Sequence, residues 1–213
     1  MDALLNAVLV VVVLLNFLAL GSSRMGAVIR TAALQGVLLG LMPLLLVQPP
    51  GWRVIVVCLA AVAIKGALIP FLLFRAMREV HIRREVEPLL GFIPSLLLGA
   101  LGTGLAALFT STLPMLAGQD LPLLLSTSFS TLMTGFIVLT TRRRAITQVV
   151  GYLILENGIY IFGLLLLDAI PFLVEMGMLL DLFVGVFVMG ILLNQIQQTF
   201  SSTDTTLLSA LKE

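Results

Sequence analysis

Long apolar runs separated by short polar breaks constrain this chain more than any other feature. A helix that crosses a membrane needs about 20 mostly apolar residues, and the 213-residue sequence contains several such runs. Hydrophobic residues make up 60% of the chain and charged residues 11%, whereas a soluble domain carries roughly 25% charged residues. A soluble fold would therefore lack the charges to cover its surface, and the sequence predicts an integral membrane protein.

The apolar runs predict an all-α, polytopic membrane protein with about seven transmembrane helices. Backbone polar groups in lipid must be satisfied inside each segment, which favours helices. The period-two alternation of membrane strands is absent from the sequence. Because the breaks are short, we expect consecutive helices to run antiparallel. The predicted spans are 3–22, 26–48, 53–78, 89–117, 122–141, 146–167 and 171–197.

Basic residues are concentrated on one side of this predicted bundle. The opposite side carries Arg53, and Lys65 lies inside a span. Cytoplasmic loops of membrane proteins are enriched in Lys and Arg, so we expect a cytoplasmic C-terminus and, with seven helices, an N-terminus outside. The residues on the basic side are Arg24, Arg30, Arg75, Arg78, Arg83, Arg84, Arg142, Arg143, Arg144 and Lys212.

The segment from Arg78 to Glu87 is the one sizeable polar insertion. Its charges of both signs lie three and four residues apart, which suits a short interfacial helix with local ion pairs. Whether residues 79–87 form a solvated connector or dock a cytoplasmic partner stays open. A single cysteine, Cys58, and a single histidine, His81, argue against a metal or iron–sulfur centre in this chain. The sequence has no basic stripe with interleaved aromatic residues, so we do not expect it to bind nucleic acid.

Four ionisable residues stand out well inside the predicted spans. Lys65 lies near the middle of the third, Glu156 of the sixth and Asp181 of the seventh, with Glu175 nearer the outer end of the seventh. A charge at the bilayer centre costs about 2.5–3.5 kcal/mol on insertion scales. Buried acids and lysines titrate closer to neutral pH, where a group can take up and release protons repeatedly. We interpret them as a candidate proton path; the alternative is that they pair for assembly alone.

Three further residues are predicted to support these groups. Tyr160 follows Glu156 by four residues and therefore shares its helix face. Asn157 is an adjacent polar residue. Pro70 follows Lys65 by five residues and has no N–H, so it frees a carbonyl one turn back, beside the lysine.

The last three predicted helices carry a recognisable pattern. It comprises Gly-Tyr-Leu-Ile-Leu-Glu-Asn-Gly at 151–158, Leu-Val-Glu-Met-Gly at 173–177, and Asp181 followed by the apolar run 184–192. This part resembles the three-helix K subunit of respiratory complex I and is similar to the C-type subunit of multisubunit cation/proton antiporters. In that family a glutamate lies in the middle helix and a second acid in the third. Glu156 matches the first position and Asp181 the second, although the complex I subunit usually has glutamate there.

The whole chain resembles the hydrogenase-4 component E family, which comprises membrane subunits of group 4 nickel–iron hydrogenases, including formate hydrogenlyase-type complexes. The resemblance rests on four additional helices in front, Lys65 with Pro70, the Leu-Glu-Asn-Gly motif and the tail 203–212. It implies an N-terminal four-helix part (1–120) and a K-subunit-like three-helix part with a short cytoplasmic tail (121–213).

The resemblance implies a non-catalytic membrane-arm subunit of a proton- or cation-translocating respiratory redox complex in a prokaryotic plasma (inner) membrane. Its intramembrane acids would contribute to the proton path. No cofactor is expected in this chain, and a nickel–iron centre and iron–sulfur clusters are expected in partner subunits. The implied partners are antiporter-like and other membrane subunits, peripheral hydrogenase subunits on the cytoplasmic side, and lipid.

Other functions remain open at this point. A subunit of a Mrp-like cation/proton antiporter would share the K-like part, although the four additional helices favour the hydrogenase. A purely structural scaffold would use the buried charges for assembly. A stand-alone transporter is less favoured because no internal repeat is evident, and a stand-alone enzyme because no nucleophile–base set appears. The ion, its stoichiometry and the electron donor cannot be predicted.

Overall fold

A computed structural model describes residues 2–47, 49, 51–79, 89–113, 122–165 and 190 of the chain. These residues contain helices and no β-strand, as predicted. Within this described part of the chain, six helices are long and apolar enough to cross a membrane, with α3, η1 and α4 joined into one of them. The elements are α1 (Asp2–Gly21), α2 (Met25–Leu46), α3 (Trp52–Ala61), η1 (Val62–Leu68), α4 (Ile69–Glu79), α5 (Phe92–Thr112), α6 (Pro122–Thr141) and α7 (Ala145–Leu164).

The first six predicted spans each correspond to one of these helices. The largest differences are at the two ends of α5, which was predicted over 89–117. It begins at Phe92 because Gly91 is extended and serves as its N-cap, and it ends at Thr112 because Leu113 is extended. The seventh predicted span, 171–197, lies outside the described residues, as does the boundary between the predicted parts 1–120 and 121–213. The count of seven and that division stay predictions.

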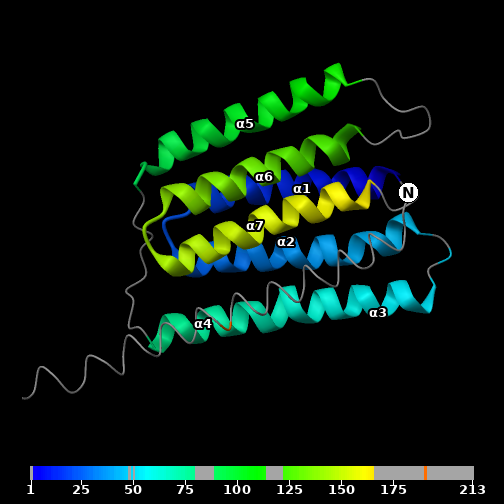
Figure 1. Cartoon of the computed structure of the whole chain (residues 1–213), viewed down its shortest axis with the longest axis horizontal. Helices are drawn as coiled ribbons and strands as arrows, with labels where there is room; N and C mark the ends of the chain where they lie inside the picture. Colours follow the sequence, from blue (N-terminus) through cyan, green and yellow to red (C-terminus); the bar gives the residue numbers. More distant parts are fainter. Residues whose placement is uncertain are drawn as a thin grey trace, which may run out of the picture.

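The six helices lie side by side with their axes along one common direction (Figure 1). Among the central helices, α1 contacts α2 and α6, and α7 also contacts α2 and α6. At one edge α5 packs on α6 and α1, and at the other edge the α3–η1–α4 helix packs on α2. Large apolar side chains remain exposed on the outer faces of the bundle, which suits a lipid environment.

Glycines bring α6 and α7 into backbone contact. A Cβ added to Gly135, Gly151 or Gly158 would lie 2.3 Å, 2.6 Å or 2.7 Å from a backbone nitrogen of the opposite helix. Small residues at such crossings let membrane helices approach closely. The hydroxyl of Ser128 also donates to the carbonyl of Gly158 over 2.9 Å. This tight hairpin fixes the α7 face that carries Glu156.

A second close approach joins α2 to the α3–η1–α4 helix through a Gly-x-x-x-Gly pair. A Cβ on Gly36 would lie 2.8 Å from the Cβ of Lys65, and one on Gly40 would lie 3.2 Å from the Cβ of Ala61. Without side chains at these two positions, Lys65 can reach past α2 into the bundle.

The third span is not a uniform α-helix, because η1 is a π-helical segment of seven residues. The N–H of Ile69 donates to the carbonyl of Ile64, five residues back, and Pro70 has no N–H to continue the series. Such π segments occur frequently at functional sites. The sequence predicted a break in the hydrogen-bond ladder near Pro70 but not this wider turn, which carries Lys65.

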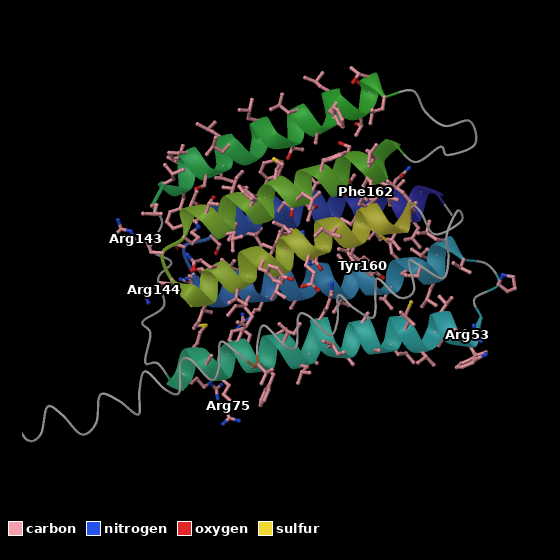
Figure 2. All side chains as sticks on the ribbon, in the orientation of Figure 1. Arg53, Arg75, Arg143, Arg144, Tyr160 and Phe162 are labelled. Atoms are coloured by element: carbon pink, nitrogen blue, oxygen red, sulfur yellow. The ribbon has the colours of Figure 1, made fainter. Side chains whose placement is uncertain are left out.

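Basic side chains gather at one end of the bundle (Figure 2). Arg75, Arg143 and Arg144 lie at that end, and Arg53 lies at the opposite end. The guanidinium of Arg53 lies 5.8 Å from the ring centroid of Trp52, a residue type that favours membrane interfaces. The one-sided distribution of described basic residues agrees with the predicted side assignment, while the orientation relative to the cytoplasm stays a prediction.

Candidate functional site

A buried ion pair joins η1 to α7 in the interior of the bundle. The Nζ of Lys65 lies 3.1 Å from Oε1 of Glu156. Lys65 is 8% exposed and Glu156 2%, so both side chains are shielded from whatever surrounds the bundle. The structure thus brings together two of the ionisable residues that the sequence singled out in separate spans.

The predicted supporting residues of α7 lie on the same side as Glu156. Lys65 donates a hydrogen bond to Oδ1 of Asn157 over 3.3 Å, and its Nζ lies 5.2 Å from the ring centroid of Tyr160. An ammonium over an aromatic face is electrostatically favourable. Lys65 is therefore held by a carboxylate, an amide oxygen and a ring, which together offset its desolvation.

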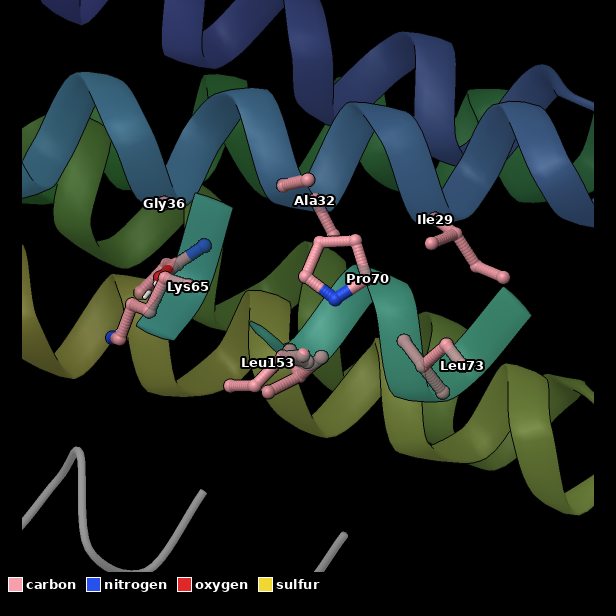
Figure 3. Close-up of a pocket in the computed structure, with 10 residues that line it drawn as sticks. Ile29, Ala32, Gly36, Lys65, Pro70, Leu73 and Leu153 are labelled. Atoms are coloured by element: carbon pink, nitrogen blue, oxygen red, sulfur yellow. Dashed lines mark hydrogen bonds between the residues drawn. The ribbon is translucent and has the colours of Figure 1, made fainter. Parts of the chain in front are cut away.

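A small hollow lies beside Lys65 (Figure 3). Lys65, Pro70, Gly36 and Asn157 line it together with apolar side chains of α2, α4 and α7. Its volume of about 10 Å³ is close to the space that one water molecule needs. Pro70, predicted from the sequence as a supporting residue, thus lies beside Lys65 and forms part of the wall.

Hydrogen bonds extend from Asn157 across the bundle through three further helices. Nδ2 of Asn157 donates to Oε1 of Gln35 over 3.3 Å, and Nε2 of Gln35 donates to Oδ1 of Asn16 over 2.7 Å. Nδ2 of Asn16 then donates to Oγ1 of Thr131 over 2.9 Å, whose hydroxyl donates to the carbonyl of Thr127 over 2.7 Å. We call Asn157, Gln35, Asn16 and Thr131 the polar chain.

Sequence analysis did not single out the outer members of the polar chain. Gln35, Asn16 and Thr131 are at most 1% exposed and lie in α2, α1 and α6. The available signal was an amide side chain inside an apolar run, as at Asn16 and Gln35. An uncharged amide costs less to bury than a charge, and therefore stands out less in the sequence.

Arg142, predicted only as one of the basic residues that orient the chain, has a structural position of its own. It is 2% exposed, donates from Nη2 to the carbonyl of Leu20 over 2.9 Å, and lies 5.2 Å from the ring centroid of Phe92. Burial lowers the pKa of its guanidinium from the ordinary value, which still leaves it a cation at neutral pH. It ties the end of α1 to the connection between α6 and α7.

Two predicted site residues, Glu175 and Asp181, lie outside the described residues. Their place in a proton path stays a prediction. Among the residues that the structure describes, no group of three or more His, Cys, Asp or Glu side chains is placed to hold a metal ion.

Comparison with known proteins gives two kinds of relative. The chain is 32% identical over 205 residues to the uncharacterized protein Rv0085 of Mycobacterium tuberculosis (strain ATCC 25618 / H37Rv). This match covers 94% of this chain and 92% of that protein. It is also 28% identical over 148 residues to hydrogenase-4 component E of Escherichia coli (strain K12), a match that covers 70% of this chain and 68% of that protein. The match to hydrogenase-4 component E of Shigella flexneri has the same extent.

No protein-family model matches the chain, and no solved structure gives a significant match. The match to the mycobacterial protein runs over nearly the full length of both chains. The chain therefore belongs to the same protein family as Rv0085, and hydrogenase-4 component E is a more distant relative.

Proposed function

We propose that this chain is a non-catalytic membrane subunit of a hydrogenase-type redox complex and that it contributes to proton or cation translocation. Similarity to hydrogenase-4 component E and six helices able to span a membrane support membership of such a complex. Electron transfer takes place in partner subunits, which hold a nickel–iron centre and iron–sulfur clusters on the cytoplasmic side. Antiporter-like membrane subunits and lipid surround this chain.

The buried pair of Lys65 and Glu156 carries the translocation part of the proposal. Two charges inside an apolar bundle cost free energy, and a well-packed apolar pair of similar volume is often at least as stable. A function explains their presence: the carboxylate of Glu156 can accept a proton and release it again, and the nearby ammonium sets how readily it does so. The hollow that Lys65 and Asn157 help to line has about the volume that one water molecule needs.

Composition of the native complex tests the membership. The tagged chain is purified from its native membrane in mild detergent, and nickel, iron and the co-purifying subunits are identified. We expect nickel and iron–sulfur subunits to come with it. Antiporter-like membrane subunits alone would favour a Mrp-like antiporter, and a chain that purifies alone and stable would contradict the complex altogether.

Replacing Glu156 by Gln tests the translocation. The amide keeps the size of the side chain but cannot take up a proton, so we expect the complex to assemble while proton movement into sealed vesicles falls by roughly 100-fold, the lower end of what a positioned acid–base group contributes. Electron transfer to an artificial dye, which measures the peripheral subunits, should fall far less.

The matched control is Thr134→Val, which changes another buried side chain, on α6, outside the ion pair and the polar chain. It should leave both activities close to those of the native complex. Assembly with full proton movement in Glu156→Gln would show that the ion pair serves only as a scaffold.

A further inference from the structure

We propose that Lys65 is a fixed positive charge and that Glu156 is the member of the ion pair that exchanges protons. The polar chain holds Lys65 in its ammonium form. This inference rests on the proposed function of the pair in proton movement, and it assigns the two residues different roles within it.

The ends of the polar chain determine its direction. The Lys65 ammonium has donors and no acceptor, so Asn157 must present its oxygen to Lys65 and donate onward from Nδ2. At the other end the hydroxyl hydrogen of Thr131 is used on the carbonyl of Thr127, so its oxygen accepts from Asn16. Gln35, in the middle, then has one orientation that satisfies both neighbours.

This direction aligns three amide dipoles. In Asn157, Gln35 and Asn16 the oxygen lies on the side toward Lys65 and the NH2 group on the side away from it. Hydrogen bonds in one direction polarise one another, and the low dielectric of a buried site strengthens their effect. The aligned amides therefore favour a positive charge at Lys65 over a neutral amine.

Amides are not acids or bases at the pH of a cell, so the polar chain positions and stabilises a charge without conducting protons. Among the described residues, the titratable groups that face Lys65 are Glu156 and Tyr160, both on α7. The α2 residues around the hollow, such as Ala32 and Gly36, are uncharged. A phenol is ordinarily a much weaker acid than a carboxylic acid, so we assign the proton exchange to Glu156, which contacts the ammonium outside the polar chain.

Two substitutions of Lys65 separate a fixed charge from a proton carrier. Arginine stays protonated at any working pH, whereas methionine removes the charge. In the purified complex reconstituted into vesicles, we expect Lys65→Arg to move protons on the order of tenfold faster than Lys65→Met, the size expected for coupled residues of one network. If both variants assemble and fall to the level of Glu156→Gln, Lys65 must release its proton and the inference is wrong.

The proposed function fails separately, because it depends on Glu156→Gln losing proton movement. Loss in Glu156→Gln together with equal loss in both Lys65 variants would keep the proposed function and reject the fixed charge.

A second measurement applies even where Lys65→Arg does not assemble. Gln35→Leu breaks the polar chain, so the ammonium should be lost more easily as the pH rises. We expect the alkaline limb of the pH–rate profile to move to lower pH in Gln35→Leu, with recovery of proton movement as the pH falls. Thr134→Val should keep the native profile.

If Gln35 had a purely structural role, Gln35→Leu would lower the rate of proton movement by the same factor at every pH. That result would overturn the inference. In the Lys65→Arg background, where the charge needs no support, Gln35→Leu should not move the alkaline limb. An equal shift in both backgrounds would contradict the role of the polar chain as well.

Discussion

Lys65 is accommodated because the residue opposite it has no side chain. A Cβ added to Gly36 would lie only 2.8 Å from the Cβ of Lys65. At this point α2 and η1 are thus too close for any side chain at position 36 without a shift. The ammonium then reaches Glu156 and Asn157 on α7. A single glycine on one helix thus determines how far a charge on a second helix extends toward a third.

Gly36→Ala should destabilise the bundle through this contact. The added methyl meets the Cβ of Lys65 and not the end of a flexible side chain, so the helices must move apart, and overpacking of this kind costs about 1–3 kcal/mol. The midpoint of thermal unfolding in detergent should fall. Gly104→Ala on α5 is the control, because its added Cβ meets nothing within 4 Å; an equal loss in both variants would contradict the explanation.

The sequence indicated part of the site at this scale. Lys65 and Glu156 were predicted because a charge in an apolar run is costly and conspicuous. Tyr160 followed from its helical spacing to Glu156, and Asn157 from being a polar residue next to it. That Lys65 pairs with Glu156 could not be predicted, since it depends on how two helices are rotated toward each other. The same dependence hid Gln35, whose partners come from α1 and α7.

Among the helices, the π segment η1 has the clearest consequence. Its hydrogen bonds span five residues where those of an α-helix span four. The segment thus accommodates an extra residue, which sets the rotation of α4 relative to α3. Buried residues before it, such as Cys58 and Ala61, and buried residues after it, such as Leu73, face the bundle at the same time.

Deleting Ala63, an exposed residue of η1, should disturb this arrangement. One residue corresponds to a rotation of about 100°, so either Lys65 or the buried face of α3 would turn away from the bundle. We expect loss of assembly into the complex, measured by co-purification. Ala63→Val changes the same position without changing the residue count and should assemble; normal assembly of the deletion variant would show that the π geometry is dispensable.

Helix spans were the best predicted elements, because about 20 consecutive apolar residues leave few alternatives in a membrane. Boundaries shifted where capping decided them, as at Gly91 before α5. The π segment could not be predicted, since apart from Lys65 the sequence 62–68 reads as an ordinary apolar helix.

For the molecule as a whole, the asymmetry of charge predicts the orientation in the membrane. The end that carries Arg75, Arg143 and Arg144 should face the cytoplasm, and the end with Arg53 should face outside (Figure 2). The lone cysteine, Cys58, is buried and is replaced by alanine in the test variants.

Single cysteines at the two ends check this orientation. In intact cells, a membrane-impermeant maleimide should label Arg53→Cys, and it should label Arg143→Cys only after the membrane is opened. The two variants control for each other's expression and reactivity. The reverse pattern would place the basic end outside and the peripheral subunits on the wrong side of the proposed complex.

Which helices become neighbours was beyond the sequence. Short breaks predicted that consecutive helices run antiparallel, but they did not predict that α1 contacts α6 or that α2 contacts α7. Those contacts join segments far apart in the chain, and no periodicity in a uniformly apolar run records them. The polar chain marks them more specifically, because each of its links joins a different pair of helices.

The distance along the chain between the ends of one such link has a consequence for synthesis. Gln35 and Asn157 are separated by 122 residues, which a ribosome adds in about 6–24 s at its usual rate of 5–20 residues per second. During that interval α1 and α2 are already made, while Asn157 on α7, which completes the polar chain, is not. A product released before α7 is made would leave the side-chain oxygen of Gln35 without its native donor, Asn157, among lipid tails. This gives membrane proteases a means to distinguish unfinished copies from finished ones.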